Sequence, residues 1–328
     1  MVILEAIKNA QNIMLSTHKS SDGDGLGSEI AMYYALKKIN KNVFFMHIDA
    51  IPARYHFLLD KVPSSAFIDL NDLEKQPTDL ALIFDTHEPS LCNPLYENLI
   101  ASQIPICFID HHIKISQIGS AHHLVIDESA SCTGEVVFEL IQKLNISLDQ
   151  EIATALYASL IFDTQNFKVL RDNAKPFQMA SALLAIGINS HSIQDQLFAN
   201  WNIEKMNFLS FLIPQVSYYE NQSIAVIRIL KKDLIHFKVD AEQIADFVDL
   251  FMQIKSLQLA IVIRQDSATN HKLSFRSRGL SKARDWALAF NGGGHTLSAG
   301  AWVNQSMPEI EKQIQDLINK NINAKLKY

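Results

Sequence analysis

Histidine and aspartate residues in the first half of the chain have the composition of a metal site. Six of them are candidate ligands: His18, Asp22, Asp24, Asp85, His111 and Asp163. Carboxylates held together repel one another and resist ionising, and divalent cations remove this conflict. Aspartate and histidine without cysteine suit Mn²⁺, Mg²⁺ or Fe²⁺ better than structural zinc. Because a shared carboxylate bridges two ions about 3.5–4 Å apart in phosphoryl hydrolysis, we predict two divalent ions, with Mn²⁺ as the first choice and Mg²⁺ as the second.

Short apolar segments must position these residues. Three of these segments are predicted strands: 12–17 (NIMLST), 80–84 (LALIF) and 104–109 (IPICFI). His18 follows the first strand directly, Asp85 the second and Asp110 the third. The carboxyl ends of parallel strands line one edge of a sheet, where ligands bind. We therefore expect these side chains to meet at one edge, and Asp163, which ends the helical run ATALYASLIF, completes the cluster.

Strand and helix patterns alternate through the first half, which is typical of βαβ units and a parallel sheet. From about 176 to 219 the period stays helical, and strand patterns return at 223–230, 257–264 and 272–277. With 328 residues, two domains are the expected number. The prediction is an α/β protein with a parallel-sheet metal-binding domain over 1–185, a helical connector over 186–219 and a smaller α/β domain over 220–328. We expect the active site in the cleft between the two domains.

The composition excludes several classes of protein. A net charge of −6 does not fit a duplex DNA binder. The chain has three cysteines, Cys92, Cys107 and Cys132. Their odd number argues against a set of disulfides and no pair has the spacing of a zinc site, which favours a reducing compartment. The start of the chain lacks the pattern of a signal peptide, and no apolar run reaches the roughly 18 residues of a membrane span. We therefore expect a cytoplasmic protein.

Other interpretations of the segment after the first strand fail. An EF-hand loop beginning at Asp22 would need oxygen ligands where Leu26 and Tyr33 stand. A dinucleotide fingerprint would need glycine at Ser28, and no glycine loop is followed by the Lys and Ser or Thr of a P-loop. The plain alternative is a helix cap and an ordinary turn. Four such segments, each at the end of a strand or helix, make that alternative the weaker one.

A glycine run marks the C-terminal part as a second candidate site. Gly292, Gly293 and Gly294 precede His295, and such a run lets backbone N–H groups approach a phosphate. Arg276 and Arg278 stand shortly before it, and strand alternation places them on the same face. Arginine binds phosphate in a bidentate manner. A flexible turn and a solvated strand face are the plain alternatives.

The remaining histidines carry no motif. His87 with Glu88, and His122 with His123, are interpreted as surface or supporting residues. The other five are interpreted as ordinary core or surface histidines: His47, His56, His191, His236 and His271.

Taken together, these segments resemble the motifs of the DHH phosphoesterases. The quoted residues are His18 to Ser28, then Asp85, then Asp110-His111-His112, then Asp163-Thr164. The segment from Arg276 through Gly292 and His295 to Ala299-Gly300 resembles the DHH-associated C-terminal domain. The resemblance covers nearly the whole chain, and it is strongest to the short bacterial enzymes that act as nanoRNases and pAp phosphatases.

The resemblance implies a role for each matching residue. One metal ion would take His18, Asp22 and Asp85. The other would take Asp24, Asp85, His111 and Asp163, so that Asp85 bridges the pair. Asp110 would orient His111, and His112 would face the scissile phosphate. The nucleotide would be held from the opposite domain by Arg276, Arg278, Gly292, Gly293, Gly294 and His295.

The resemblance leaves several activities open. The two-domain length favours hydrolysis of short oligoribonucleotides (nanoRNA) to mononucleotides, with removal of the 3′-phosphate of 3′,5′-bisphosphoadenosine (pAp) as a further activity. Cyclic or linear dinucleotide phosphodiesterases, single-strand DNA exonucleases and inorganic pyrophosphatases belong to the same superfamily. A non-catalytic nucleotide-binding protein is disfavoured because all six ligands are present. The expected partners are short single-stranded RNA or small nucleotides, without duplex DNA or membrane, and both a monomer and a homodimer stay open.

Overall fold

The computed structural model describes residues 2–113, 123–171, 174–199, 201–241, 243–279, 281–294 and 296–325. The chain divides into two units, Met1–Asn200 and Trp201–Tyr328, and each is described by itself. None of the described helices is long and apolar enough to cross a membrane.

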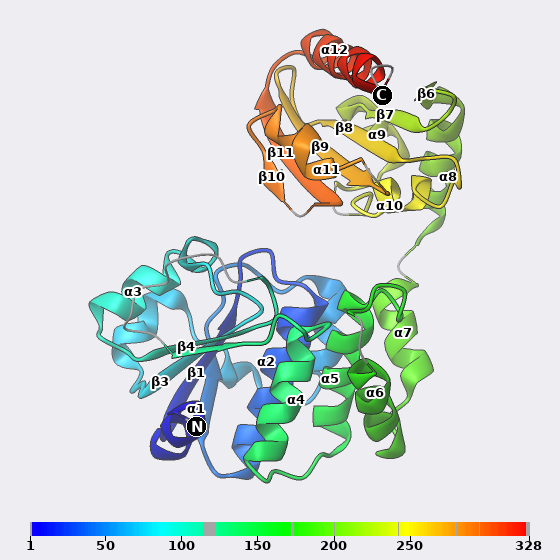
Figure 1. The fold of residues 1–328 in the computed structure, drawn as a ribbon. Coiled ribbons are helices and arrows are strands. Elements are labelled where there is room, and N and C mark those ends of the chain that lie inside the picture. Colours follow the sequence, from blue (N-terminus) through cyan, green and yellow to red (C-terminus); the bar gives the residue numbers. More distant parts are fainter. Residues whose placement is uncertain are drawn as a thin grey trace. The chain divides into compact units, whose positions relative to one another are not determined.

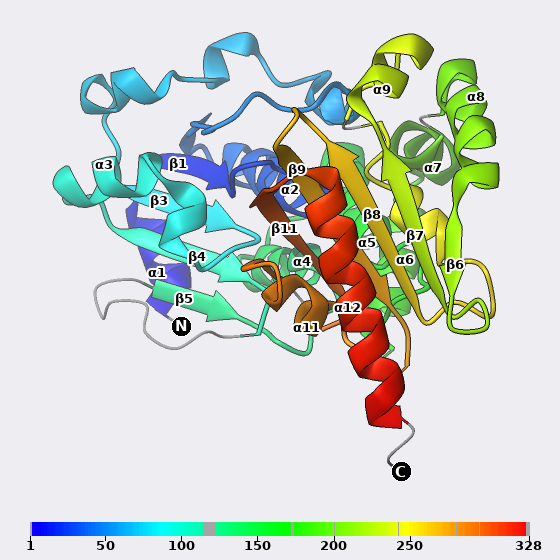
Figure 2. The ribbon, with the colours of Figure 1, turned by 90° about the horizontal axis from the view of Figure 1, so that it is seen from above.

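The apolar segments of the first unit form a five-stranded sheet of order β2-β1-β3-β4-β5, in which every neighbouring pair is parallel. The strands are β1 (Asn12–Thr17), β2 (Asn42–Phe45), β3 (Leu80–Phe84), β4 (Ile106–Asp110) and β5 (His123–Ile126). Figure 2 shows β3, β4 and β5 side by side. The predicted α/β class with a parallel first sheet is therefore confirmed.

Helices cover both faces of this sheet, because alternate strand residues are apolar on each face. Ile13 and Leu15 pack into one core, whereas Met14 packs into the other. The first core also receives α1 (Val2–Asn9), α2 (Gly23–Lys38), α4 (Thr133–Lys143), α5 (Gln150–Asp163), α6 (Lys175–Ala185) and α7 (Ser190–Phe198). Figure 1 shows α2, α4, α5 and α6 as neighbouring helices. The second core receives α3 (Leu95–Ala101). The first unit also contains the 3₁₀ helices η1 (Ala53–Leu59), η2 (Ser64–Ala66), η3 (Leu70–Lys75) and η4 (Pro89–Cys92).

The second unit is built on a mixed sheet of order β10-β11-β9-β8-β7-β6, in which β7 and β8 are parallel and the other pairs antiparallel. Its strands are β6 (Ser217–Tyr219), β7 (Ile224–Ile229), β8 (Leu259–Gln265), β9 (Asn270–Ser277), β10 (Gly293–Gly294) and β11 (Ser298–Asn304). Its helices are α8 (Ile203–Leu212), η5 (Ile213–Gln215), α9 (Lys231–Phe237), α10 (Phe247–Phe251), α11 (Ala283–Leu288) and α12 (Met307–Lys325). Of the segment expected to be a helical connector, α7 falls in the first unit and α8 in the second. Ser217–Tyr219 within that segment is a strand, because it pairs with the edge of β7.

Candidate metal centre

Three neighbouring strands deliver polar side chains to one edge of the first sheet. His18 follows β1, Asp85 follows β3, and Asp110 ends β4. These strands are adjacent in the order β1-β3-β4 and parallel, so their carboxyl ends meet. Asp22 caps α2, and its Oδ1 accepts hydrogen bonds from the N–H groups of Asp24 (3.0 Å) and Gly25 (3.3 Å). The strand-to-loop transition after β1 thereby fixes the cap and brings Asp24 into the first turn of the helix.

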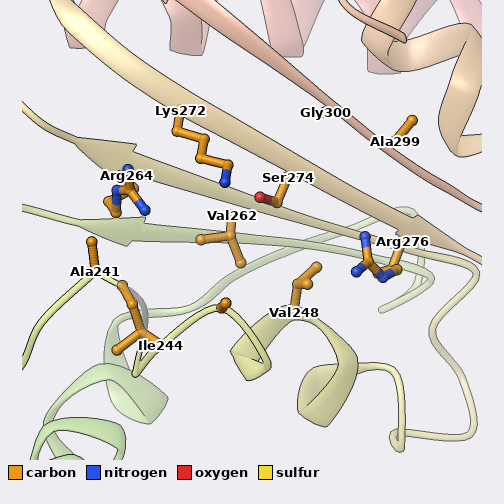
Figure 3. Close-up of a pocket in the computed structure, with 11 residues that line it drawn as sticks. Ala241, Ile244, Val248, Val262, Arg264, Lys272, Ser274, Arg276, Ala299 and Gly300 are labelled. Carbon is orange, nitrogen blue, oxygen red and sulfur yellow. The ribbon is translucent and has the colours of Figure 1, made fainter. Parts of the chain in front are cut away.

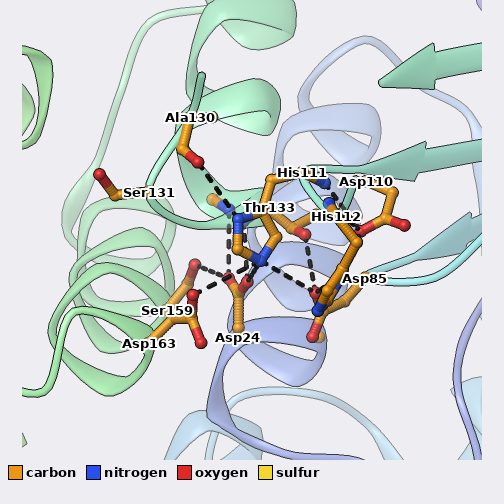
Figure 4. A network of polar contacts seen from close by, with 12 residues as sticks. Asp24, Asp85, Asp110, His111, His112, Ala130, Ser131, Thr133, Ser159 and Asp163 are labelled. Atoms are coloured by element: carbon orange, nitrogen blue, oxygen red, sulfur yellow. Dashed lines mark hydrogen bonds and ion pairs between the residues drawn. The ribbon is translucent and has the colours of Figure 1, made fainter. Parts of the chain in front are cut away.

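All six predicted ligands fall into two groups of three, each with ligand atoms within 4.8 Å of one another. The first group contains His18, Asp22 and Asp85, and the second contains Asp24, His111 and Asp163. Nε2 of His111 lies 3.4 Å from Oδ2 of Asp163 and 3.6 Å from Oδ2 of Asp24. Asp85 lies next to both groups, because its Oδ2 is 3.5 Å from Nε2 of His18 and its Oδ1 is 3.8 Å from Nε2 of His111. Figure 4 shows the second group with Asp85 beside it.

Two further residues hold the carboxylates in place, and sequence reasoning did not find them. Thr133, at the start of α4, donates its N–H to Oδ2 of Asp24 (2.8 Å) and its hydroxyl to Oδ1 of Asp85 (2.9 Å). Ser159 of α5 donates its hydroxyl to Oδ1 of Asp24. Backbone N–H groups at a helix start favour anions, and those of Thr133 and Gly134 both donate to the carboxylate of Asp24. The available signal was the Ser131-Cys132-Thr133 stretch before the helical pattern, a common kind of helix start.

The cluster is electrostatically strained without a counter-ion. Burial, followed by repulsion from Asp24 and Asp22, raises the pKa of Asp85 well above its usual value. Burial and the same two carboxylates raise the pKa of Asp163 to about 8. Burial raises the pKa of Asp22, with a smaller contribution from Asp24. These are the shifts expected of carboxylates gathered to bind cations.

His111 provides the test of whether a metal fits. Nδ1 of its ring contacts the backbone carbonyl of Ala130 at 3.2 Å, so this nitrogen carries the proton. Its Nε2 is buried, has no hydrogen-bond partner among the residues that the structure describes, and faces Asp24, Asp85 and Asp163. A buried lone pair aimed at three carboxylates is satisfied by a divalent cation. The donor set therefore fits divalent ions.

Asp110 contacts three histidines, His111 through its backbone N–H and His112 and His87 through their rings. It accepts the backbone N–H of His111 (2.7 Å), and its Oδ1 accepts Nδ1–H of His112 (2.8 Å). Its Oδ2 bonds Nδ1 of His87, which the sequence predicts to be a surface or supporting residue and which is buried. Although burial opposes ionisation of Asp110, the hydrogen bonds from His112 and His87 hold its pKa below the usual range. Nδ1 of the His111 ring contacts the Ala130 carbonyl, and the predicted role of Asp110 in orienting His111 stays a prediction.

The two arginines predicted to bind substrate lie on β9 and just after its end. Arg276 donates from Nε to Oδ1 of Asp249 on α10 (2.6 Å). Arg278 follows the end of β9, and its Nη2 donates to the carbonyl of Met252 just after α10 (2.6 Å). Both guanidinium groups therefore bond to the same helical segment.

The glycine run is partly a strand. Gly293 and Gly294 form β10, which pairs with Gly300 and Ala299 of β11. A Cβ on Gly292 would lie 2.2 Å from the carbonyl oxygen of Gly300, so this glycine is required for packing. A Cβ on Gly293 would meet no described residue within 4 Å, so the described part of the chain leaves open space beside this backbone. His295 lies outside the described residues.

The comparison with protein families assigns both units. The model of the DHH family N-terminal domain matches residues 12–160, and the model of the DHHA1 domain matches residues 221–326. The chain belongs to the DHH family. This membership confirms the predicted metal-dependent phosphoesterase.

Named relatives of this DHH chain act on different substrates. It is 28% identical to the bifunctional oligoribonuclease and PAP phosphatase NrnA of Thermus thermophilus, over 92% of this chain and 87% of that protein. It is 26% identical to the cyclic-di-AMP phosphodiesterase GdpP of Bacillus subtilis, over 95% of this chain and 49% of that protein. Its fold matches an exopolyphosphatase-related protein from Bacteroides fragilis with a TM-score of 0.86 and 22% identity, covering 97% of this chain and 95% of that chain.

Proposed function

We propose that this DHH chain hydrolyses short oligoribonucleotides to mononucleotides and also removes the 3′-phosphate of pAp. The observation that carries the proposal is the pair of three-residue ligand groups with Asp85 beside both. Such a pair suits two divalent ions in phosphoester hydrolysis. The oligoribonuclease and PAP phosphatase relative spans 92% of this chain, which supports RNA and pAp as the substrates.

The residues that would hold the ions are His18, Asp22 and Asp85 for one, and Asp24, Asp85, His111 and Asp163 for the other. When bound, the ions lower the pKa of a water molecule and offset the negative charge that grows on the phosphate. Oxygen and imidazole donors without a thiolate suit Mn²⁺, with Mg²⁺ as the second choice.

His112 is the side chain proposed to contact the scissile phosphate. It is 36% exposed, whereas His111 is 4% exposed, so a substrate can reach it. Burial alone would lower its pKa, but the hydrogen bond to Asp110 and the nearby charge of that carboxylate raise it. A protonated His112 then donates a hydrogen bond to a phosphate oxygen and stabilises the charge of the transition state. Asp110 keeps the ring in position through the 2.8 Å contact with Nδ1.

Arg276, Arg278 and Gly293 are the proposed nucleotide contacts of the second unit. Arginine supplies the planar donors that suit a phosphate. The open space beside Gly293 lets a ligand approach the backbone. The space beside Gly292 and Gly294 is instead filled by atoms of β11. A Gly293→Ala substitution should therefore raise KM for RNA without changing the thermal unfolding temperature. An unchanged KM would remove Gly293 from the site.

A second candidate function is hydrolysis of cyclic or linear dinucleotides. The match to the cyclic-di-AMP phosphodiesterase extends over 95% of this chain, which favours it. The same ligands and the same phosphodiester chemistry would serve both substrates.

The three buried cysteines, which form no disulfide, are consistent with the proposed cytoplasmic location.

A substrate panel tests the proposal. The purified chain would be incubated with Mn²⁺ or with chelator, and with a two-nucleotide RNA, a five-nucleotide RNA, pAp, cyclic-di-AMP or pyrophosphate. We expect metal-dependent release of mononucleotides from both RNAs and of phosphate from pAp. Turnover of cyclic-di-AMP alone would select the second candidate, and turnover of pyrophosphate alone would reject both.

A further inference from the structure

One face of the second sheet carries a row of cations that the proposed function does not use. Along β9, Leu273 and Phe275 face the core beneath α11 and α12, so Lys272 and Ser274 point to the opposite face. Lys272 is the cross-strand neighbour of Arg264 on β8 and of Trp302 on β11. Trp302, Lys272 and Arg264 therefore form a continuous row across three strands.

A cavity of about 270 Å³ lies against this face. Figure 3 shows Arg264, Lys272, Ser274 and Arg276 on its sheet side, with Ile244 and Val248 opposite. Three cations and a hydroxyl on one wall, facing apolar side chains on the other, suit a ligand that carries both phosphate and a flat apolar group.

The charges in this cavity are only partly compensated. Arg264 is paired with Asp266 (2.8 Å), and Arg276 is paired with Asp249 (2.6 Å). Within the described part of the chain, Lys272 forms no ion pair, and it points between the two arginines. Burial and the charge of Arg264 lower the pKa of Lys272, Asp266 opposes this shift in part, and Arg276 adds a smaller contribution to it. An anion placed beside Lys272 would relieve this repulsion.

Trp302 is an exposed indole beside these cations. Its side chain is 66% exposed, and its ring centroid lies 5.4 Å from Nζ of Lys272 and 5.6 Å from Cζ of Arg264. An exposed aromatic ring next to cations is the arrangement with which proteins bind single-stranded nucleic acids, by stacking bases and holding phosphates.

We propose that Trp302, Lys272 and Arg264 bind a further nucleotide of a single-stranded oligoribonucleotide, with its base on Trp302 and its phosphate at Lys272. The proposal rests on the proposed function and adds a determinant of substrate length. Lys272 and Arg276 are four residues apart on β9, a separation of about 13 Å along an extended strand. A mononucleotide such as pAp bound at Arg276 does not reach Trp302, whereas an RNA of several nucleotides does.

Tryptophan fluorescence tests this binding without hydrolysis. The chain has three tryptophans, and Trp302 is the exposed one, whereas Trp201 is half-buried and Trp286 is buried. In chelator, titration with a five-nucleotide RNA should quench the fluorescence, and Trp302→Leu should remove the quench and raise Kd about tenfold, as for one lost base stack. Kd of the variant would be read from a labelled RNA by anisotropy. Lys272→Gln should lower the slope of log Kd against log salt by about one.

The matched control is Tyr218→Leu, which removes an exposed aromatic side chain from β6 at the other edge of the sheet. This variant should bind the RNA like the unmodified chain. Equal Kd values for Trp302→Leu and the unmodified chain would overturn the inference, as would tighter binding to an acidic peptide than to the RNA. Trp302-dependent binding without any RNA hydrolysis would instead reject the proposed function and leave the binding surface standing.

Discussion

Nδ1 of His87 is hydrogen-bonded to Oδ2 of Asp110, and both side chains are buried beside the candidate metal centre. The other oxygen of Asp110 accepts Nδ1–H of His112 at 2.8 Å. The carboxylate of Asp110 is thus hydrogen-bonded from two sides. Its fixed position in turn holds the ring of His112, the histidine that is proposed to contact the phosphate. We propose that His87 is a positioning residue, because it is hydrogen-bonded to the carboxylate that holds His112.

Replacing His87 by alanine should lower kcat about tenfold, the lower part of the range for residues that support metal ligands. KM should stay within about twofold, because no substrate contact is removed. Steady-state kinetics on a two-nucleotide RNA would measure both. The exposed His56 of the same unit is the control, and its alanine variant should keep both constants. An unchanged kcat for His87→Ala would show that Asp110 does not need this partner.

The Asp85→Asn substitution should weaken metal binding while it stabilises the folded metal-free chain. The amide keeps the hydroxyl contact with Thr133 but removes a buried charge that is repelled by Asp24 and Asp22. The metal-free variant should therefore unfold at a higher Tm than the unmodified chain, while its gain in Tm on adding Mn²⁺ should be smaller. Its kcat should fall by more than the roughly 100-fold expected for residues that only support the ligands.

Differential scanning fluorimetry with and without Mn²⁺ would measure these shifts. The exposed Asp60 provides the control, since Asp60→Asn should leave the Mn²⁺-induced gain unchanged. An Asp85→Asn variant with the full Mn²⁺-induced gain and normal turnover would contradict the bridging position.

The metal-free chain should lose stability as the pH rises toward 8. Asp163 has a pKa of about 8 when folded against 3.8 for the free side chain, so the folded state binds the extra proton. The stability linked to that proton is complete below about pH 4 and is lost as the pH rises through about 8. His111, whose pKa is lowered by burial from 6.5, acts in the opposite direction below that value. The clearest window is therefore between about pH 6.5 and 8.

Unfolding temperatures measured in chelator across this window would test the sign. Asp163→Asn should flatten the decline, and saturating Mn²⁺ should reduce it, because the cation favours the ionised carboxylates. The effect on stability is limited because Asp163 is 38% exposed. A metal-free chain that gains stability between pH 6.5 and 8 would contradict the raised pKa.

Gly27→Ala should destabilise the first unit by about 1–3 kcal/mol through overpacking. A Cβ at this position of α2 would lie 2.6 Å from the carbonyl oxygen of Ala155 and 2.9 Å from the N atom of Ser159, both backbone atoms of α5. Gly293→Ala is the matched control, because its Cβ would meet nothing within 4 Å in the described segments, and its stability change should stay within about 0.5 kcal/mol. Urea unfolding would compare the two, and equal midpoints would show that α2 and α5 have room to separate.

The strand ends of the first unit are predictable from the sequence because the apolar runs are continuous and end at polar residues. LALIF stops at Asp85, and ICFI stops at Asp110, so the topology of a parallel sheet brings them together. Strand β5 is harder to predict, since its four residues are only half-buried and form no such run.

The supporting contacts are not predictable in the same way. Thr133 and Ser159 meet Asp24 only because α4 and α5 pack against α2, and hydroxyl residues carry no periodic signal. The glycine run was expected to be a binding loop, but pairing with β11 is permitted by the absence of side chains at Gly292 and Gly294. The sequence places Arg276 on a strand but does not reveal that Asp249 pairs with it across 27 residues.

The stoichiometry of Mn²⁺ binding tests the account most directly. Calorimetric titration of the metal-free chain should show two ions bound per chain, and Asp85→Asn should weaken both because its side chain lies beside both ligand groups. Binding of one ion, or two ions with unchanged affinity in Asp85→Asn, would contradict the two-metal centre.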